Sequence, residues 1–222
     1  MNADLDDPAA DDVGDDDTSM ALPSPLPLFP LRTVLFPGGL LGLKVFEARY
    51  LDMVSRCLRE QSPFGVVCLR QGSEARSGAP VQLETVGVLA RIEEVDSEQA
   101  GILSLRCVGS RRFRLSGPAV QAPDGLWQAP AEALPDDEPE APAAALKPTV
   151  EALVQAIANL AAQDVKPFVE PYRFEDAGWV ANRWCEILPI SLAAKQKLME
   201  LDDAGTRLKL VDEYLRSKGV LR

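Results

Sequence analysis

The sequence predicts an α+β fold in which a mixed β-sheet curls into a small barrel and a helical bundle follows it. First, residues 81–95 and 102–115 alternate apolar and polar side chains and are joined by a polar turn, which is typical of antiparallel strands. Second, apolar residues recur every three or four positions after residue 148, as in amphipathic helices. These two periods divide the chain into a strand-rich half and a helical half.

The apolar stretch over residues 26–54 contains the elements around which we expect the chain to be organised. Proline cannot donate to a sheet ladder, so Pro27, Pro30 and Pro37 predict an extended segment with a loop over residues 26–37, not a regular central strand. A glycine pair then turns into a strand over 40–45, which leads into a helix over 47–61. We expect Arg49 of this helix to hold a loop carbonyl or a carboxylate.

Further elements follow from the same two periods. We expect a strand at 64–70, a polar loop at 71–80 and a polar turn at 93–101, with a bulge or bend at Gly87. Residues around Trp127 suit an edge strand. Four helices should follow, over 149–163, over 176–188, from a cap at Ser191 to about 201, and from Asp202 or Asp203 to a stop at Gly219.

Composition excludes several classes of protein. The 222-residue chain contains no histidine, which removes the commonest general base, the Ser-His triad and most zinc sites. Its four cysteines lie far apart without a C-x-x-C pair, so we expect buried thiols in a reduced cytoplasm. No apolar run reaches the roughly 18 residues of a membrane span, and the acidic N-terminus is not a signal peptide.

The net charge of −11 is concentrated in two segments. Residues 1–31 hold eight aspartates and residues 116–146 hold six acidic residues, with no Lys or Arg in either, so the remainder carries +3. Segments of this kind bury little apolar surface, and we expect them to be mobile. The predicted organisation is therefore a disordered acidic leader (1–24), a β-barrel part (25–130), an acidic Pro/Ala linker (131–147) and a helical bundle (148–222).

Several short motifs follow one another along the chain. The most specific is LPLFPL, then VLFPG, then FEARY, within residues 26–50; FGV at 64–66, VGVLARI at 86–92, VGSRRFR at 108–114 and KQKLMEL at 195–201 follow. In this order the motifs resemble the N-terminal (substrate-binding) domain of Lon proteases. The resemblance covers about residues 25–217. It implies a pseudo-barrel related to the PUA fold, then helices, in a domain that helps to capture damaged or tagged polypeptides.

The resemblance is to the non-catalytic part of an ATP-dependent serine peptidase. The chain contains no G-x-x-x-x-G-K-[ST] phosphate-binding loop, so it resembles a stand-alone form without ATPase and protease domains. We therefore expect a cytoplasmic, non-enzymatic module without cofactor or metal, related to protein quality control. Its expected partners are unfolded or tagged polypeptide and a separate protease or ATPase; a weak homodimer is compatible with the sequence, and a membrane partner is not expected.

Two groups of residues suggest a catalytic or a nucleic-acid site but also fit structural roles. Ser191 and Lys195 have the i, i+4 spacing of a Ser-Lys dyad, but a helix cap and a lysine one turn later explain them better. A cluster at Arg106, Arg111, Arg112 and Arg114 makes an RNA-binding PUA-like module the alternative function. We favour the structural explanation, in which these arginines pair with Glu84, Glu93 or Glu94.

The candidate polypeptide-binding residues are apolar. They are Phe29, Leu31, Val34, Leu35 and Phe36 in the proline-containing stretch, with Trp179 in the helical half. Such a stretch either packs beneath the helices or forms an exposed apolar patch, and the sequence leaves both open. We expect a client groove between this stretch and the helices.

Overall fold

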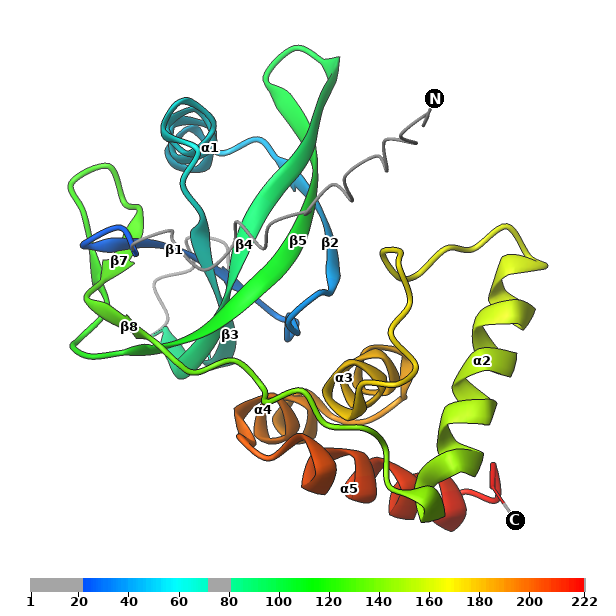
Figure 1. Cartoon of the computed structure of the whole chain (residues 1–222). Helices are drawn as coiled ribbons and strands as arrows, with labels where there is room; N and C mark the ends of the chain where they lie inside the picture. Colours follow the sequence, from blue (N-terminus) through cyan, green and yellow to red (C-terminus); the bar gives the residue numbers. More distant parts are fainter. Residues whose placement is uncertain (1–21, 72–80, 222) are drawn as a thin grey trace, which may run out of the picture.

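The computed structural model describes residues 22–71 and 81–221, so the predicted leader and the predicted loop at 71–80 lie almost wholly outside the described part. A mixed sheet with one helix against it forms one half of the molecule, and four α-helices form the other (Figure 1). The first half contains β1 (Leu26–Leu31), β2 (Leu40–Val45), α1 (Ala48–Glu60), β3 (Phe64–Gln71), β4 (Gln82–Gln99), β5 (Ile102–Leu115), β6 (Val120–Gln121), β7 (Trp127–Ala129) and β8 (Ala131–Ala133). The second contains a 3₁₀ turn, η2 (Ala144–Leu146), and α2 (Lys147–Ala161), α3 (Ala177–Ile187), α4 (Leu192–Glu200) and α5 (Ala204–Ser217). The predicted α+β class is confirmed.

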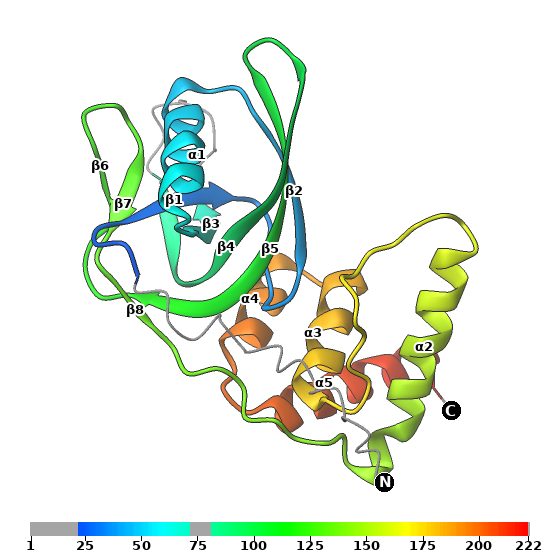
Figure 2. The ribbon, with the colours of Figure 1, turned by 45° about the horizontal axis from the view of Figure 1, so that its top comes forward.

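The sheet is ordered β2-β5-β4-β3-β1-β7-β6, with β8 also paired to β5. The β1–β3 pair is parallel, with β2 and α1 lying between them in the chain, and the other pairs are antiparallel. The long β4–β5 hairpin extends away from the rest of the sheet (Figure 2). The predicted turn at 93–101 is wrong in extent, because β4 continues to Gln99 and turns at Gly101, whose φ is +80°.

Strand β1 corrects a second prediction. Residues 26–31 were expected not to form a central strand, yet β1 lies between β3 and β7. Pro27 stands opposite a residue of β7 and Pro30 opposite one of β3. Because only these two residues of β1 lack an N–H, β7 and β3 each lose at most one hydrogen bond from β1. All six side chains of β1 are buried, and this burial compensates for the missing hydrogen bonds.

Helix α1 covers the sheet with Tyr50, Met53, Val54 and Cys57, as its period predicts. Phe46 and Leu58 fit the same helical period, yet they are exposed by 66% and 44%. By this period Arg49 belongs on the outer face, yet it is buried and donates to the Gly125 carbonyl oxygen at 3.0 Å. The loop-holding role expected for Arg49 is therefore confirmed.

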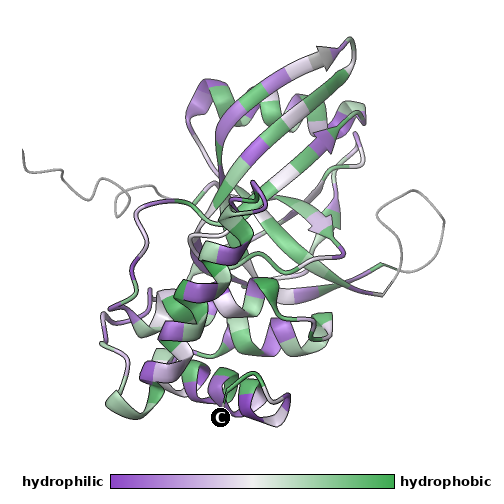
Figure 3. Cartoon of the chain, turned by 90° about the vertical axis from the view of Figure 1, so that its right-hand side faces the viewer, coloured by the Kyte–Doolittle hydropathy of each residue, from purple (hydrophilic) through white to green (hydrophobic). Residues whose placement is uncertain are grey.

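The helical half agrees closely with its sequence pattern. Asp176, Ser191 and Asp203 each accept a hydrogen bond from a backbone N–H in the first turn of α3, α4 and α5. The inward residues of α5, Leu208, Val211 and Leu215, are fully or almost fully buried. Apolar and polar residues take different sides of these helices (Figure 3), and all four cysteines are buried free thiols.

The acidic segment over 134–143 joins the two halves and is docked, contrary to the mobility expected of it. Asp137 accepts from Arg207 at 2.6 and 3.0 Å and from Arg112 at 3.4 Å. Arg112 belongs to β5 and Arg207 to α5, and both guanidinium groups are almost fully buried. One carboxylate thus links the sheet, the connecting segment and the last helix, a long-range contact that local composition does not encode.

Candidate functional site

The sheet and the helices meet at residues 32–39, which connect β1 to β2. Arg183 of α3 is fully buried and donates to the carbonyl oxygens of Pro37, at 2.7 Å, and Gly38. Its guanidinium carbon lies 5.5 Å from the ring centroid of Phe168, and Glu186 Oε1 pairs with its Nη2 at 2.9 Å. The charge of this buried guanidinium is paired and both of its terminal nitrogens donate, whereas its buried Nε has no hydrogen-bond partner among the described residues.

The glycine pair before β2 is required by this contact. The Gly38 N–H donates to the Gly109 carbonyl at 2.7 Å, and the Gly109 N–H donates to the Gly39 carbonyl at 2.9 Å. With φ of +72° at Gly38, this is the pattern of a bulge whose first residue is left-handed glycine. A Cβ on Gly39 would lie 2.2 Å from Glu186 Oε1, so a side chain there would displace the carboxylate.

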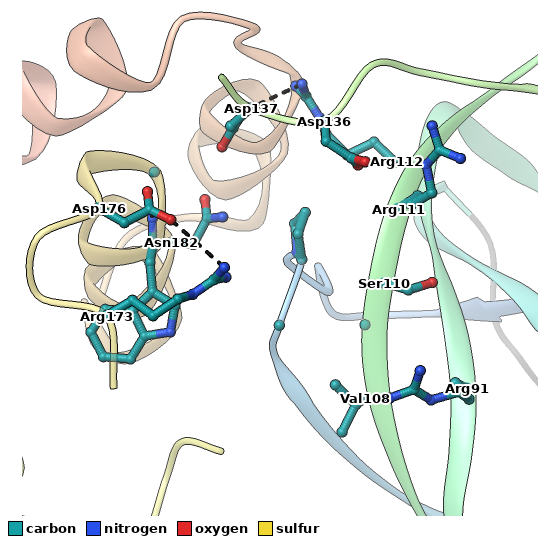
Figure 4. Close-up of a pocket in the computed structure, with 15 residues that line it drawn as sticks. Arg91, Val108, Ser110, Arg111, Arg112, Asp136, Asp137, Arg173, Asp176 and Asn182 are labelled. Carbon is teal, nitrogen blue, oxygen red and sulfur yellow. Dashed lines mark hydrogen bonds and ion pairs between the residues drawn. The ribbon is translucent and has the colours of Figure 1, made fainter. Parts of the chain in front are cut away.

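A larger cavity of about 450 Å³ lies between the sheet and the start of α3 (Figure 4). Arg91, Val108 and Ser110 line it from the sheet, and Asp176 and Asn182 from the helical side. Its charges are largely paired within the chain: Arg91 with Glu93 at 2.9 Å, Arg111 with Asp136 at 3.3 Å, and Arg173 with Asp176 at 3.9 Å. This cavity is polar and of mixed charge.

A smaller cavity of about 240 Å³ lies where residues 33–35, the first half of β2, residues 167–168 and helices α3 and α4 meet. Its apolar wall consists of Val34, Leu35, Leu40, Leu41, Pro167, Phe168 and Ile187. Two charged side chains, Glu186 and Lys195, also line it. The cavity therefore combines apolar side chains with two charged ones where the two halves of the fold meet, a place where ligand sites often occur.

Burial controls the protonation of the groups around this smaller cavity. It raises the pKa of Glu186 from its ordinary 4.5 to about 7, against the opposing charges of Arg183 and Lys195. Burial also lowers the pKa of Arg183 and raises that of Cys185 to about 12. Glu186 therefore changes charge near neutral pH at the contact between the sheet and the helices, while the Cys185 thiol is unreactive.

All six candidate binding residues are buried, with exposed fractions from 0% to 8%. Three of them line a cavity: Val34 and Leu35 the smaller one, and Trp179 the larger one. Phe29, Leu31 and Phe36 line neither of these two cavities and pack in the core, where Phe29 stacks on Tyr50 with centroids 4.0 Å apart. Of the two alternatives left open by the sequence, the structure has the buried one: the apolar side chains of residues 29–36 pack in the core, and an exposed apolar patch there is ruled out.

Ser191 and Lys195 do not meet as a catalytic pair. The Ser191 hydroxyl accepts from the Ala194 N–H at 3.2 Å, and the Lys195 ammonium donates to the Glu186 carbonyl oxygen at 2.8 Å. The cap explanation for Ser191 is confirmed. Lys195 is not simply solvated, because it fastens α4 to the end of α3.

The arginine cluster on β5 is mostly occupied by partners. Arg106 pairs with Glu94 at 2.8 Å, as the sequence predicted, and Arg111 pairs with Asp136. Arg112 is buried against the helical half, where it donates to the Leu201 carbonyl at 3.0 Å. Only Arg114 has no partner within residues 22–71 and 81–221, so the basic surface that suggested RNA is not present as a continuous patch.

Sequence reasoning missed the helical side of the smaller cavity. Arg183 and Glu186 stand one turn apart on α3, a spacing that predicts only a surface ion pair. Leu40, Leu41 and Phe168 appeared as strand or loop residues without a role. The available signal was the Gly38-Gly39 pair, since adjacent glycines beside a strand indicate close approach by another part of the chain.

Within the described residues, no group of His, Cys, Asp or Glu side chains could hold a metal ion. The same part of the chain has no helix long and apolar enough to cross a membrane.

Comparison with known proteins gives a consistent family. The sequence model described as "ATP-dependent protease La (LON) substrate-binding domain" matches residues 25–217. Among curated proteins, Lon protease 2 of Myxococcus xanthus is 30% identical over 207 residues and Lon protease of Anaeromyxobacter dehalogenans is 29% identical. Each alignment covers 89% of this chain and 24% of the relative, so the chain spans about a quarter of the length of these proteins.

Two solved structures share the fold. The crystal structure of a Lon N-terminal domain protein from Xanthomonas campestris is 31% identical, with a TM-score of 0.68 over 85% of this chain and 97% of that one. The N-terminal domain of a Mycobacterium avium complex Lon protease is 17% identical, with a TM-score of 0.60 over 85% of this chain and 96% of that one. At that identity the second similarity concerns the fold alone.

Proposed function

The chain belongs to the family of Lon substrate-binding domains, and on this premise we propose that it is a non-enzymatic module that captures unfolded or tagged polypeptides. In this proposal the strand-rich half is PUA-like and the helices form its bundle. The client passes to a separate protease or ATPase in the cytoplasm. The supporting observation is the smaller apolar cavity, which opens between the two halves beside residues 33–35.

The cavity suits a weak and general polypeptide site. Its volume of about 240 Å³ holds a side chain or two, not a cofactor. Val34 and Leu35 belong to it, so part of the client groove expected between residues 29–36 and the helices is retained. We expect dissociation constants on the order of micromolar, because one or two apolar side chains and a few backbone hydrogen bonds limit the affinity.

A folded and an unfolded form of one protein test the proposal. Reduced, carboxymethylated α-lactalbumin, which is unfolded, should bind the purified chain in a fluorescence-anisotropy titration, and native α-lactalbumin should not. The Leu40→Ser variant should weaken this binding, because Leu40 lines the smaller cavity and lies outside the core clusters. Equal binding of both α-lactalbumin forms, or of neither, would contradict a module for unfolded polypeptide.

A control introduces serine at an apolar position elsewhere. Val120 on β6 is 50% exposed and does not line the smaller cavity. Val120→Ser should therefore bind unfolded α-lactalbumin as the unchanged protein does. If both serine variants bind alike, the client surface lies away from the smaller cavity.

A further inference from the structure

We propose that the outer edge of β2 binds the client as an added β-strand, with one client side chain in the smaller cavity. This inference rests on the proposed function and specifies how the polypeptide is held. The occupant is an extended, uncharged segment with apolar side chains at alternate positions.

Strand β2 ends the sheet and leaves main-chain groups free. It pairs with β5 on one side, and within the described residues no other strand runs along its outer side. The opposite end of the sheet, β6, has only two residues, whereas β2 has six. In Figure 1 β2 forms the margin of the sheet. Unpaired edge strands of this length are templates for pairing with another chain.

The bulge at Gly38-Gly39 defines which residues of β2 face outward. The Gly39 carbonyl accepts from Gly109 of β5, so it points toward β5. Because peptide groups alternate along an antiparallel pair, Leu41 and Leu43 also bond toward β5, and Gly42 and Lys44 direct their N–H and C=O outward. Gly42 and Lys44 are exposed, so these groups are accessible to a partner strand.

The chain itself already uses the start of this edge. Gly39 forms an isolated antiparallel bridge with Phe168, from the segment between α2 and α3. An extended segment therefore fits beside β2 at one end, and a client strand would continue the same edge toward Gly42 and Lys44. Strand addition of this kind supplies affinity through main-chain hydrogen bonds and leaves specificity to side-chain pockets.

The smaller cavity lies at the same end of the edge and has a charge pattern that suits a peptide. Leu40 and Leu41 of β2 line it together with Glu186 and Lys195. Because Glu186 changes charge near neutral pH, these two side chains carry at most one net positive charge, and an uncharged apolar client side chain is repelled in neither state. A peptide group carries a donor and an acceptor, which complement a carboxylate and an ammonium side by side.

The test removes one outward N–H without changing the β2–β5 ladder. The probe is a capped, fluorescent octapeptide with leucine at alternate positions. Gly42→Pro should weaken its binding about tenfold, since proline cannot donate and is tolerated on edge strands. Gly42→Ala is the matched control and should bind normally, because a Cβ at Gly42 meets nothing within 4 Å. Thermal unfolding checks that both variants fold.

A second pair of variants and a modified probe keep the proposal falsifiable. If Gly42→Pro does not fold, Lys44→Pro compared with Lys44→Ala tests the next outward N–H. The same octapeptide should lose binding when the amides that would face β2 are N-methylated. The unmodified peptide should slow hydrogen exchange of the backbone amides of Gly42 and Lys44 in the protein.

The outcomes separate the two proposals. Unchanged octapeptide binding in the proline variants, or equal binding of the N-methylated peptide, overturns strand addition while leaving polypeptide binding intact. If the unchanged protein binds neither the octapeptide nor unfolded α-lactalbumin, the proposed function itself is overturned.

Discussion

At the scale of single residues, Glu186 is the group at the contact between the two halves whose charge changes near neutral pH. Its carboxylate pairs with Arg183 of α3 and lies against the backbone at Gly39, and the positive charge of Lys195 on α4 also acts on it. Burial outweighs both positive charges and raises the Glu186 pKa to about 7. Ionisation of the Glu186 carboxylate therefore lowers the stability of the folded state.

The first prediction is the pH dependence of this effect. Between pH 4.5 and about 7 the folded state holds a proton on Glu186 that the unfolded state has released, so stability falls as the pH rises through this window. The full loss is on the order of 3 kcal/mol. Chemical denaturation from pH 4.5 to 8 should show less of this decline in Glu186→Gln.

The control for this prediction is an exposed glutamate. Glu213 of α5 is exposed to solvent, and Glu213→Gln should keep the decline of the unchanged protein. If Glu186→Gln and Glu213→Gln have parallel stability–pH curves, Glu186 does not titrate in this window.

At the scale of elements, the connecting segment shows how one ion pair can order an acidic, proline-rich stretch. Asp136 and Asp137 are neighbours with the same chemistry, but their side chains are 61% and 17% exposed. The difference arises from the strand and the helix on either side. Arg112 and Arg207 both pair with Asp137 and not with Asp136, and Arg112 has a second, mostly exposed carboxylate partner in Asp202.

The second prediction concerns the stability of this clamp. Asp137→Asn should lower the free energy of unfolding by about 3–5 kcal/mol, because it removes the buried carboxylate shared by two buried guanidinium groups and leaves Arg112 only the exposed Asp202. Asp136→Asn is the matched control and should cost about 0–1 kcal/mol, as for an exposed pair. Urea denaturation measures both, and equal losses would mean that burial of the partner is irrelevant.

The third prediction concerns order in the same segment. Glu140 is exposed and is followed by alanine, yet a glutamyl endopeptidase should cut slowly after it in the native protein because the docked backbone does not fit a protease cleft. In Asp137→Asn, cleavage there should accelerate, as followed by mass spectrometry. Rapid cleavage of the unchanged protein at this site would show that the segment is loose.

At the scale of the whole molecule, the two halves cover one another's apolar surface along residues 29–36. Residues from both halves belong to one continuous core cluster, and a separate smaller cluster lies under β1, β5 and β7. Substituting the core residue Phe36 by Asp should therefore unfold the protein, whereas a change at the cavity rim such as Leu40→Ser should not. The client site is best tested at the rim.

The fourth prediction is the absence of catalysis by the purified chain. It should neither hydrolyse ATP nor cleave unfolded casein, because its sequence has no phosphate-binding loop and Ser191 and Lys195 are engaged as a cap and a helix tie. Malachite-green phosphate release and casein electrophoresis measure this. Casein cleavage that disappears in Ser191→Ala would overturn it.

The fifth prediction separates polypeptide from nucleic-acid binding. The affinity for the uncharged octapeptide should change little between 50 and 200 mM salt. A nucleic-acid site with six to ten phosphate contacts would lose roughly 10³–10⁵ in affinity over this range. A steep salt dependence with a single-stranded RNA, together with micromolar binding, would restore the RNA alternative.

The sequence by itself determined the elements whose signal is local. Strand β2 and strand β5 have the predicted bounds, and Ser191 and Asp203 cap the predicted helices, since alternation, helical period and capping depend on neighbouring residues. Tertiary structure alone decided that β1 is central, that Asp137 is clamped and that Phe29, Leu31 and Phe36 are core. Each of these features depends on partners far away in the chain, such as Arg207 for Asp137. The smaller cavity likewise exists only where β2, Phe168 and α3 meet. Burial and pairing between distant segments are properties of the packed molecule, so a local pattern indicates a candidate side chain but not the surface that covers it.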